Sequence, residues 1–405
     1  MKLDLKFVRT QFPAFSEPSL NGWAFFENAG GSYPCIQFIN ILTSFYMKNK
    51  VQVNYPYPAS ILAGELMEAS YKRFADYLNV EDSEIHFGPS TTQNIYVLAN
   101  AMRPMWKDGD EIIVSCQDHE ANAGAWRKLA SQGIKILEWH VNSETGLLSL
   151  GELNGLFSER TKMVAFPHCS NIIGYVNPVK EISQMAHKHG ALSVVDGVGY
   201  APHGFPDIKD LESDIYLFSL YKTFGPHLGL MYVKNSLIAK MENQSHFFKE
   251  GMTRSMLTPA GPDHAQIAAA SGIIDYFDAI YEHHFDKNES PAQKNRALNR
   301  LFHEHEKELL ETLLDFLRSR NDIQIIGPNT SDARAPIVSI IPKNKPLFGL
   351  TAGLPVNLEG LVGDNGKVFG LDHFGYSAPA NVLDEKFGFT GEKVSKEVLA
   401  YLKTV

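Results

Sequence analysis

Short apolar runs alternate with helical patterns between about residue 55 and residue 233. Leu62, Leu66, Ser70, Phe74 and Leu78 recur every four residues, which predicts a helix with one mostly apolar face. Strands that alternate with helices are typical of a mainly parallel sheet with helices on both faces. The predicted strands lie at residues 84–87, 111–114, 135–138, 163–166, 192–195, 215–218 and 228–233.

The pattern changes after about residue 262. Two long helices are predicted at about 265–285 and 297–318, and a shorter α+β region runs from residue 323 to the end. We therefore predict an α/β fold with a large domain at residues 26–262 and a small C-terminal α+β domain at residues 263–405. We expect residues 1–25 to pack on the small domain.

Composition narrows the class of protein. The 405 residues include 37 Lys and Arg against 46 Asp and Glu, a net charge of −9, so the basic surface of a nucleic-acid binder is not expected. The three cysteines are far apart, which argues against a disulfide scaffold or a structural metal site. No apolar run approaches the ~18 residues of a membrane helix, and the charged start lacks the apolar stretch of a signal peptide. We expect a cytoplasmic enzyme.

Asp196 and Lys222 carry the strongest chemical signal. Each lies at or just beyond the end of a predicted strand, and ligands of open α/β sheets bind at the carboxyl ends of strands. A lysine and an aspartate in one crevice suit pyridoxal phosphate, because the lysine can form a Schiff base and the aspartate can hold the ring nitrogen protonated. A surface lysine and a turn aspartate would fit the spacing equally well. P-loop and dinucleotide-binding motifs are absent from the sequence.

Other predicted strands also end in polar groups. Ser90, Thr91 and Thr92 lie in a loop that opens an apolar helix, where free N–H groups and hydroxyls would bind a phosphate. An ordinary helix cap is the alternative, and both can hold. His119 follows another strand and could stack on a flat cofactor or transfer protons, and Asn171 follows a further one. Four successive strand ends thus bring polar groups to one edge of the sheet.

Six stretches of the chain resemble the class V aminotransferase superfamily of fold-type I pyridoxal-phosphate enzymes, and in particular its cysteine desulfurase-like branch. They occur in the family's order and spacing and cover roughly residues 1–270. The resemblance implies a fold-type I architecture with a seven-stranded type of sheet in the large domain. The matching stretches are 27–31 (ENAGG), 88–92 (GPSTT), 118–122 (DHEAN), 170–174 (SNIIG), 195–197 (VDG) and 219–226 (SLYKTFGP).

The resemblance assigns roles to residues that match its motifs. It implies that Lys222 carries the cofactor, that Asp196 contacts the pyridine nitrogen and that His119 stacks on the ring. It also implies that Thr92 and Ser219 contact the phosphate.

Further expectations concern the substrate and the partner subunit. Asn171 is implied near the ring hydroxyl or the substrate carboxylate, and Asn28 is a candidate for substrate binding. Tyr221 replaces the histidine that commonly precedes the lysine, and we count it among the cofactor-binding residues. The resemblance further implies a homodimer with its site at the interface, where Thr258 would reach the phosphate of the partner.

Two departures affect the reaction. Desulfurases use a cysteine of the C-terminal domain as nucleophile, and this chain has no cysteine after Cys169. We interpret Cys116 and Cys169 as small packing residues. The chain also has no arginine after Arg334, and Val368 or a neighbour stands where relatives carry a carboxylate-binding arginine.

Several residues could replace that arginine. Arg254 is the leading candidate and Lys367 a weaker one, because lysine offers a point charge instead of a planar fork. Alternatively, the substrate has no α-carboxylate and binds through His373 or Tyr376. Surface charge or core packing would equally explain all of these residues.

We therefore expect a pyridoxal-phosphate enzyme that acts on a small amino acid or related amine through an external aldimine and a carbanion at Cα. The amine of Lys222 would be the general base. Transamination, β-elimination and epimerisation all remain open, and an aminotransferase-like or lyase outcome is favoured. The alternatives are cleavage of the cysteine desulfurase or selenocysteine lyase type, and a non-catalytic cofactor-binding module.

Overall fold

The computed structural model describes residues 2–343, 347–350, 362, 366–370 and 380–404. The chain forms two compact units: Met1–Asp315 with Ile326–Ser339, and Phe316–Ile325 with Ile340–Val405. Within the described residues, no helix has the length and apolar character needed to cross a membrane.

A seven-stranded sheet forms the centre of the larger unit, in the order β1-β7-β6-β5-β4-β2-β3. Strands β2 to β6 are parallel, whereas β7 is antiparallel to both β1 and β6. The predicted mainly parallel sheet is confirmed. Its strands are β1 (Ile85–Gly88), β2 (Glu111–Ser115), β3 (Lys135–Trp139), β4 (Thr161–Pro167), β5 (Leu192–Asp196), β6 (Ile215–Ser219) and β7 (Gly229–Val233).

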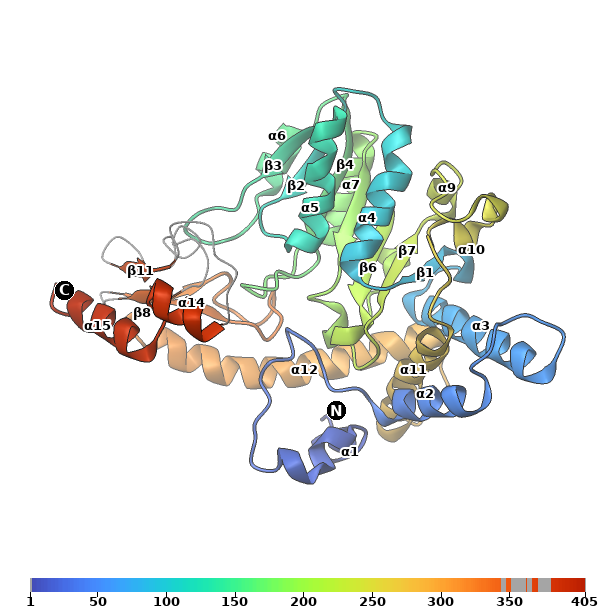
Figure 1. Cartoon of the computed structure of the whole chain (residues 1–405), viewed down its shortest axis with the longest axis horizontal. Helices are drawn as coiled ribbons and strands as arrows, with labels where there is room; N and C mark the ends of the chain where they lie inside the picture. Colours follow the sequence, from blue (N-terminus) through green and yellow to red (C-terminus); the bar gives the residue numbers. More distant parts are fainter. Residues whose placement is uncertain (1, 344–346, 351–361, 363–365, 371–379, 405) are drawn as a thin grey trace. The chain divides into compact units, whose positions relative to one another are not determined.

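The larger unit also contains helices, several of which cover the sheet (Figure 1). They are α1 (Leu5–Thr10), α2 (Ile36–Lys48), α3 (Pro58–Leu78), α4 (Thr91–Met102), α5 (Glu120–Lys128), α6 (Leu150–Leu156), α7 (Val179–Lys188), α8 (Ile208–Leu211), α9 (Asn235–Ile238), α10 (Thr253–Met256), α11 (His264–His284) and α12 (Pro291–Arg318), the last of which continues into the smaller unit.

Neighbouring residues of each strand enter two different cores, because side chains alternate across a sheet. Val194 and Leu217 belong to a core that includes residues of α4 and α5. Val195, Tyr216 and Phe218 belong to a second core that includes residues of α3, α7 and α11. Burial of both faces explains why these strands are almost continuously apolar.

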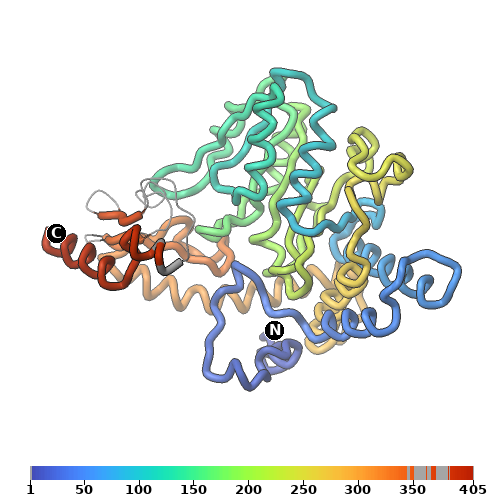
Figure 2. Tube along the Cα trace, viewed as in Figure 1, coloured from blue at the N-terminus to red at the C-terminus, as the bar shows by residue number. Residues whose placement is uncertain are grey.

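Helix α11 is part of the larger unit. It is buried along most of its length and packs beside α2 and α3 (Figures 1 and 2). The division between the units therefore lies later in the chain than the predicted boundary at residue 262. The N-terminal segment also packs on α11: the Phe7 ring stacks on His283 at 3.8 Å, and the Asp4 N–H donates to Nε2 of His284 at 2.9 Å. His283 and His284 lie in the range 263–405 on which we expected residues 1–25 to pack, and both belong to the larger unit.

The C-terminal part contains short strands and helices. Strands β8 (Ile323–Ile326) and β9 (Ser339–Pro342) form one two-stranded sheet, and β10 (Phe348–Leu350) pairs in parallel with β11 (Lys367–Phe369). Helices α14 (Ala380–Phe387) and α15 (Gly391–Tyr401) follow.

Candidate active site

One edge of the sheet gathers the polar residues. The parallel strands β4, β5 and β6 end there, and the antiparallel β7 begins there, since Ser219 of β6 pairs with Gly229 of β7. A cavity of about 240 Å³ lies at this edge, and we call it the cofactor cavity. Nine of the predicted site residues line it: Ser90, Thr91, Thr92, His119, Asn171, Asp196, Ser219, Tyr221 and Lys222.

The loop before α4 supplies a cradle for an anion. Ser90 caps the helix, and its Oγ accepts a hydrogen bond from the Gln93 N–H at 3.1 Å. The Thr91 hydroxyl is buried and has no hydrogen-bond partner among the described residues. Gly229 lies so close to this loop that a Cβ on it would come within 2.5 Å of the Thr91 nitrogen. An unpaired hydroxyl beside the free N–H groups of a helix start fits a phosphate.

Asp196 is a buried carboxylate without a bonded cation among the described residues. It is 4% exposed, and its Oδ1 accepts one hydrogen bond, from the Val198 N–H at 2.8 Å. Burial raises the pKa of Asp196, although the Val198 N–H and the charges of His119 and Lys222 oppose this shift. A protonated ring nitrogen would supply the positive partner that this carboxylate lacks.

A second carboxylate, Asp118, also lines the cofactor cavity and was not among the predicted site residues. Loss of hydration and the nearby Asp196 charge raise the pKa of Asp118 well above its usual range. Its Oδ2 accepts a hydrogen bond from the Asn122 side chain at 2.6 Å. The sequence signal for Asp118 is its position directly before His119.

The ring of His119 is held by the start of α5. His119 caps this helix, and its Nδ1 accepts a hydrogen bond from the Ala121 N–H at 3.0 Å. Since Nδ1 is an acceptor, the proton of the neutral ring lies on Nε2. This bond orients an exposed ring on the cavity wall, where it can stack on a flat ligand.

Lys222 lies in the tight turn η7 (Leu220–Lys222) that follows β6. The next residues brace this turn: the Thr223 hydroxyl donates to the Ser219 carbonyl at 2.8 Å, and the Phe224 N–H donates to Ser32 Oγ at 2.8 Å. Phe224 has a φ of 63°, a costly conformation that these contacts maintain. The structure records no hydrogen bond or ion pair of the Lys222 amine with the residues it describes, so this amine is free to react.

Two residues that were predicted to bind the substrate, Arg254 and Lys367, do not line the cofactor cavity. The guanidinium of Arg254 bonds Glu68 and, at 3.1 Å, Asp82, so it is already paired and does not line the cofactor cavity. Lys367 pairs with Glu397 at 2.8 Å.

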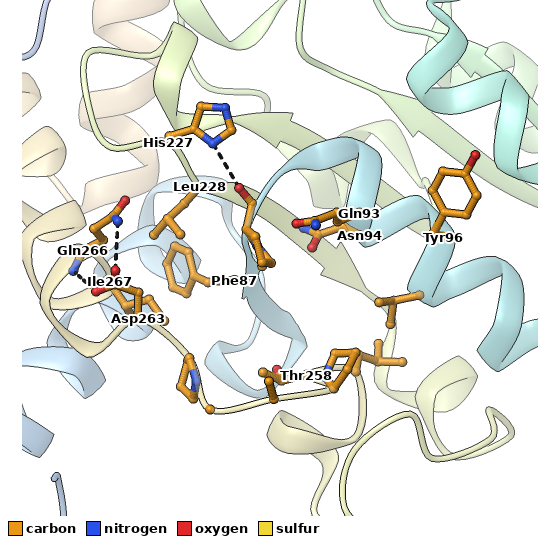
Figure 3. A pocket seen from close by; sticks show the side chains of 18 residues that line it. Phe87, Gln93, Asn94, Tyr96, His227, Leu228, Thr258, Asp263, Gln266 and Ile267 are labelled. Atoms are coloured by element: carbon orange, nitrogen blue, oxygen red, sulfur yellow. Dashed lines mark hydrogen bonds between the residues drawn. The ribbon is translucent and has the colours of Figure 1, made fainter.

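Four further predicted residues do not line the cofactor cavity within the described part of the chain. Asn28 does not line the cofactor cavity. Thr258 lines a neighbouring cavity of about 470 Å³ (Figure 3). His373, like Tyr376, lies outside the described residues.

The two cysteines at the sheet edge differ. Cys169 is buried, and burial raises the pKa of its thiol to about 12, as expected for a packing residue. The same interpretation is wrong for Cys116, which is exposed because it follows the last residue of β2. The Cys116 thiol donates to Glu138 Oε2 at 2.8 Å and lies 3.4 Å from Nδ1 of His140. Partial burial and the Glu138 charge raise the pKa of Cys116 to about 11.

Sequence comparison now identifies the family. The profile of the Aminotransferase class-V family matches residues 24–259, which is more than half of the chain. The chain belongs to the class-V aminotransferase family. A second profile, the Transketolase-like TK C-terminal domain, matches residues 330–390.

The chain is 33% identical over 342 residues to the aminotransferase-like protein FGM3 of Gibberella zeae, covering 82% of the chain and 80% of the relative. It is 34% identical over 241 residues to a cysteine desulfurase of Escherichia coli, covering 58% of the chain and 59% of that relative. Its fold is similar to that of the apo cysteine desulfurase of Thermococcus onnurineus, with a TM-score of 0.72 and 22% identity over 85% of this chain and 84% of the other.

Family membership decides the class of protein. Class-V aminotransferases and cysteine desulfurases are pyridoxal-phosphate enzymes, so the chain is an enzyme of transferase or lyase type. The alternative of a non-catalytic module is therefore set aside.

Proposed function

We propose that the cofactor cavity binds pyridoxal phosphate and that the enzyme acts on the amino group of a small amino acid or related amine. One observation carries this proposal: the unpaired Lys222 amine and the buried Asp196 carboxylate line the same cavity. The Thr91 hydroxyl, which has no partner among the described residues, supports a phosphate position at the start of α4. These groups match the three attachment points of the cofactor, namely its aldehyde, its ring nitrogen and its phosphate.

When bound, pyridoxal phosphate supplies a ring that accepts the electron pair left when a bond at Cα breaks. The chain contributes the remaining steps. Asp196 keeps a proton on the ring nitrogen, and His119 covers one face of the ring and excludes water there. The Lys222 amine removes the proton from Cα and can return it at another atom, which is general acid–base catalysis.

Hydroxyls and N–H groups at the start of α4 hold the phosphate. Ser90, Thr91 and Thr92 belong to this loop, and Ser219 approaches from the end of β6. Tyr221 and Asn171 line the same cavity and would contact the remaining substituents of the ring or the substrate.

We further propose a homodimer. Large aromatic side chains are exposed on a single chain, including Trp23 (83%), Phe26 (91%) and Phe247 (85%). A partner subunit that covered these side chains would remove their apolar surface from water. Thr258, which lies outside the cofactor cavity of its own chain, would then be available to the partner's phosphate. A cytoplasmic location stays a prediction.

The reaction type can be tested by incubating the cofactor-loaded enzyme with a panel of small amino acids and amines. Transamination should convert the cofactor to its amine form with release of a keto acid or aldehyde. A lyase should release ammonia or a β-substituent and leave the cofactor unchanged. Failure of every member to change the visible spectrum or yield a product would contradict the proposed function.

Cys116 should be a poor nucleophile at neutral pH. Because its pKa is raised to about 11, the thiol is protonated at pH 7, and alkylation by iodoacetamide should speed up as pH rises towards 11. Glu138→Gln removes the negative charge beside the thiol and leaves the Arg127 guanidinium, whose Nε now lies 3.0 Å from Glu138 Oε1, with Glu120 as its acidic partner. The pKa of Cys116 should then fall, and alkylation at pH 8 should be faster than in the wild type.

The variant Cys116→Ala tests whether this thiol takes part in the reaction. Its turnover should equal that of the wild type. A persulfide trapped on Cys116 during incubation with L-cysteine would contradict this expectation and favour desulfuration.

A further inference from the structure

His227 lies beside the loop that we assign to the phosphate. Its ring Nδ1 is 3.1 Å from the carbonyl oxygen of Pro89, the residue directly before Ser90 (Figure 3). Two positions after His227, Gly229 packs against the same loop, since a Cβ on it would come within 2.5 Å of the Thr91 nitrogen. His227 also lines the cofactor cavity, as Ser90 and Thr91 do. The turn before β7 is thus held against the start of α4 at two points.

The contact with Pro89 determines which ring atom of His227 is available to a ligand. A carbonyl oxygen only accepts, so Nδ1 must carry a hydrogen and donate it. The structure records no hydrogen bond or ion pair of Nε2 with the residues it describes. When the ring is protonated, Nε2 carries the second N–H and can donate it to an anion. The ring is therefore fixed through one nitrogen and can bind an anion through the other.

The charges in the cofactor cavity favour a cation beside the phosphate. A phosphate ester carries close to two negative charges at pH 7. The carboxylates of Asp118 and Asp196 already line the cavity, and no arginine is found among its described lining residues. The start of α4 offers neutral hydroxyls and the partial positive charge of a helix N-terminus. The phosphate would therefore bind more tightly if a side chain added a full positive charge.

The other basic groups of the cavity have different tasks. Among the described lining residues these groups are Lys222 and His119. In the proposed function the Lys222 amine is taken by the aldehyde of the cofactor. The Nδ1 atom of His119 accepts the Ala121 N–H at the start of α5, and its ring covers one face of the cofactor. His227 is the remaining basic side chain, and it is the one that contacts the phosphate loop.

We propose that protonated His227 is the charged ligand of the cofactor phosphate, with Nε2 as the donor. This inference rests on the proposed function of the cavity and adds a cofactor-binding residue to it. The phosphate favours the protonated ring in return, because a nearby opposite charge stabilises the charged form of a titratable group.

Two substitutions separate this role from a structural one. His227→Asn places an amide nitrogen near the position of Nδ1, so it can keep the bond to Pro89 but has no charge and no donor at Nε2. His227→Arg keeps a positive charge beside the loop and gives up the ring. If His227 binds the phosphate, Arg should retain most of the phosphate affinity that Asn loses. A structural role predicts the opposite order.

The probes are pyridoxal phosphate and pyridoxal, which differ only by the phosphate group. Both carry the aldehyde that attaches to Lys222, so visible absorbance measures both dissociation constants. His227→Asn should weaken the binding of pyridoxal phosphate roughly ten- to hundred-fold, the range for one hydrogen bond between charged groups, and leave the binding of pyridoxal unchanged. His189→Asn, a substitution of an exposed histidine at the end of α7, is the control and should change neither constant.

Inorganic phosphate gives a second measurement that needs neither the cofactor nor turnover. Calorimetry should detect its binding to the cofactor-free wild type, with an affinity that falls roughly ten- to hundred-fold in His227→Asn. This measurement does not depend on Lys222, so its result is independent of the proposed function.

Three results would overturn the role of His227. They are an unchanged affinity of His227→Asn for pyridoxal phosphate, an equal loss of affinity for both pyridoxal probes, and equal binding of inorganic phosphate by the variant and the wild type. The proposed function is judged separately, by the attachment of the cofactor to Lys222.

Discussion

Replacing Lys222 by alanine should abolish covalent attachment of pyridoxal phosphate. The amine of this residue is unpaired at the edge of the cofactor cavity, and its loss also removes the proposed general base at Cα. Turnover should fall by roughly 10²- to 10⁴-fold or more, the range for a lost acid–base group. Borohydride reduction followed by peptide mapping should locate the cofactor on Lys222 in the wild type and on no residue of the variant.

Lys209→Ala is the matched control, because Lys209 is an exposed lysine on α8. This variant should retain both the covalent cofactor and the activity. The circular dichroism of Lys222→Ala should match that of the wild type, since no hydrogen bond or ion pair of this side chain is recorded with the residues that the structure describes. A reduced cofactor found on a different lysine of the wild-type enzyme would refute the assignment.

Asp196→Asn should cause the second large loss. A neutral amide no longer keeps the ring nitrogen protonated, so the ring becomes a weaker acceptor of electrons. We expect turnover to fall roughly 10²- to 10³-fold, as when one electrostatic contact to a developing charge is removed. Steady-state kinetics should place the loss in kcat, and the exposed Asp210→Asn on α8 is the control. Wild-type turnover in Asp196→Asn would show that the carboxylate is not needed.

Asp196→Asn lowers turnover, but it should not lower the stability of the cofactor-free protein. The pKa of Asp196 is raised in the folded state, so the folded state binds more protons than the unfolded one between about 3.9 and that raised pKa. The free energy of unfolding therefore rises as pH falls through that window, because Asp196 becomes protonated in the folded state first. Above the window, the ionised buried carboxylate lowers the stability of the folded state. Asp196→Asn should remove this dependence, and urea unfolding at pH 7 should show no loss of stability.

The sequence predicted much of the site because of a simple property of parallel sheets. Each strand reads as an apolar run, and the residue that ends it must lie at the same edge as the ends of its neighbours. Asp196 and Ser219 end their strands, and Lys222 follows shortly after, so their convergence could be inferred without coordinates. The cap of α4 was recognisable from local composition for a different reason, namely that serine and threonine side chains bind the free N–H groups at the start of a helix.

Other features depend on contacts between residues far apart in the chain. Arg254 was a candidate ligand for a carboxylate, but Glu68 and Asp82, which come from α3 and the turn before β1, occupy its guanidinium. Cys116 could not be distinguished from the buried Cys169 by its neighbours, because both lie beside strand ends.

The sequence alone therefore determined the alternation of strands and helices, and with it the edge at which Asp196 and Lys222 meet. The tertiary structure decided which charged side chains at that edge have no ion-pair partner among the described residues. Such partners come from distant parts of the chain that pack together, so the spacing of residues in the sequence does not reveal them. It also placed His227 there, since β7 runs antiparallel to β6 and therefore begins at the edge where β6 ends. Strand direction and long-range ion pairs are properties of the assembled sheet, and no local pattern of residues encodes them.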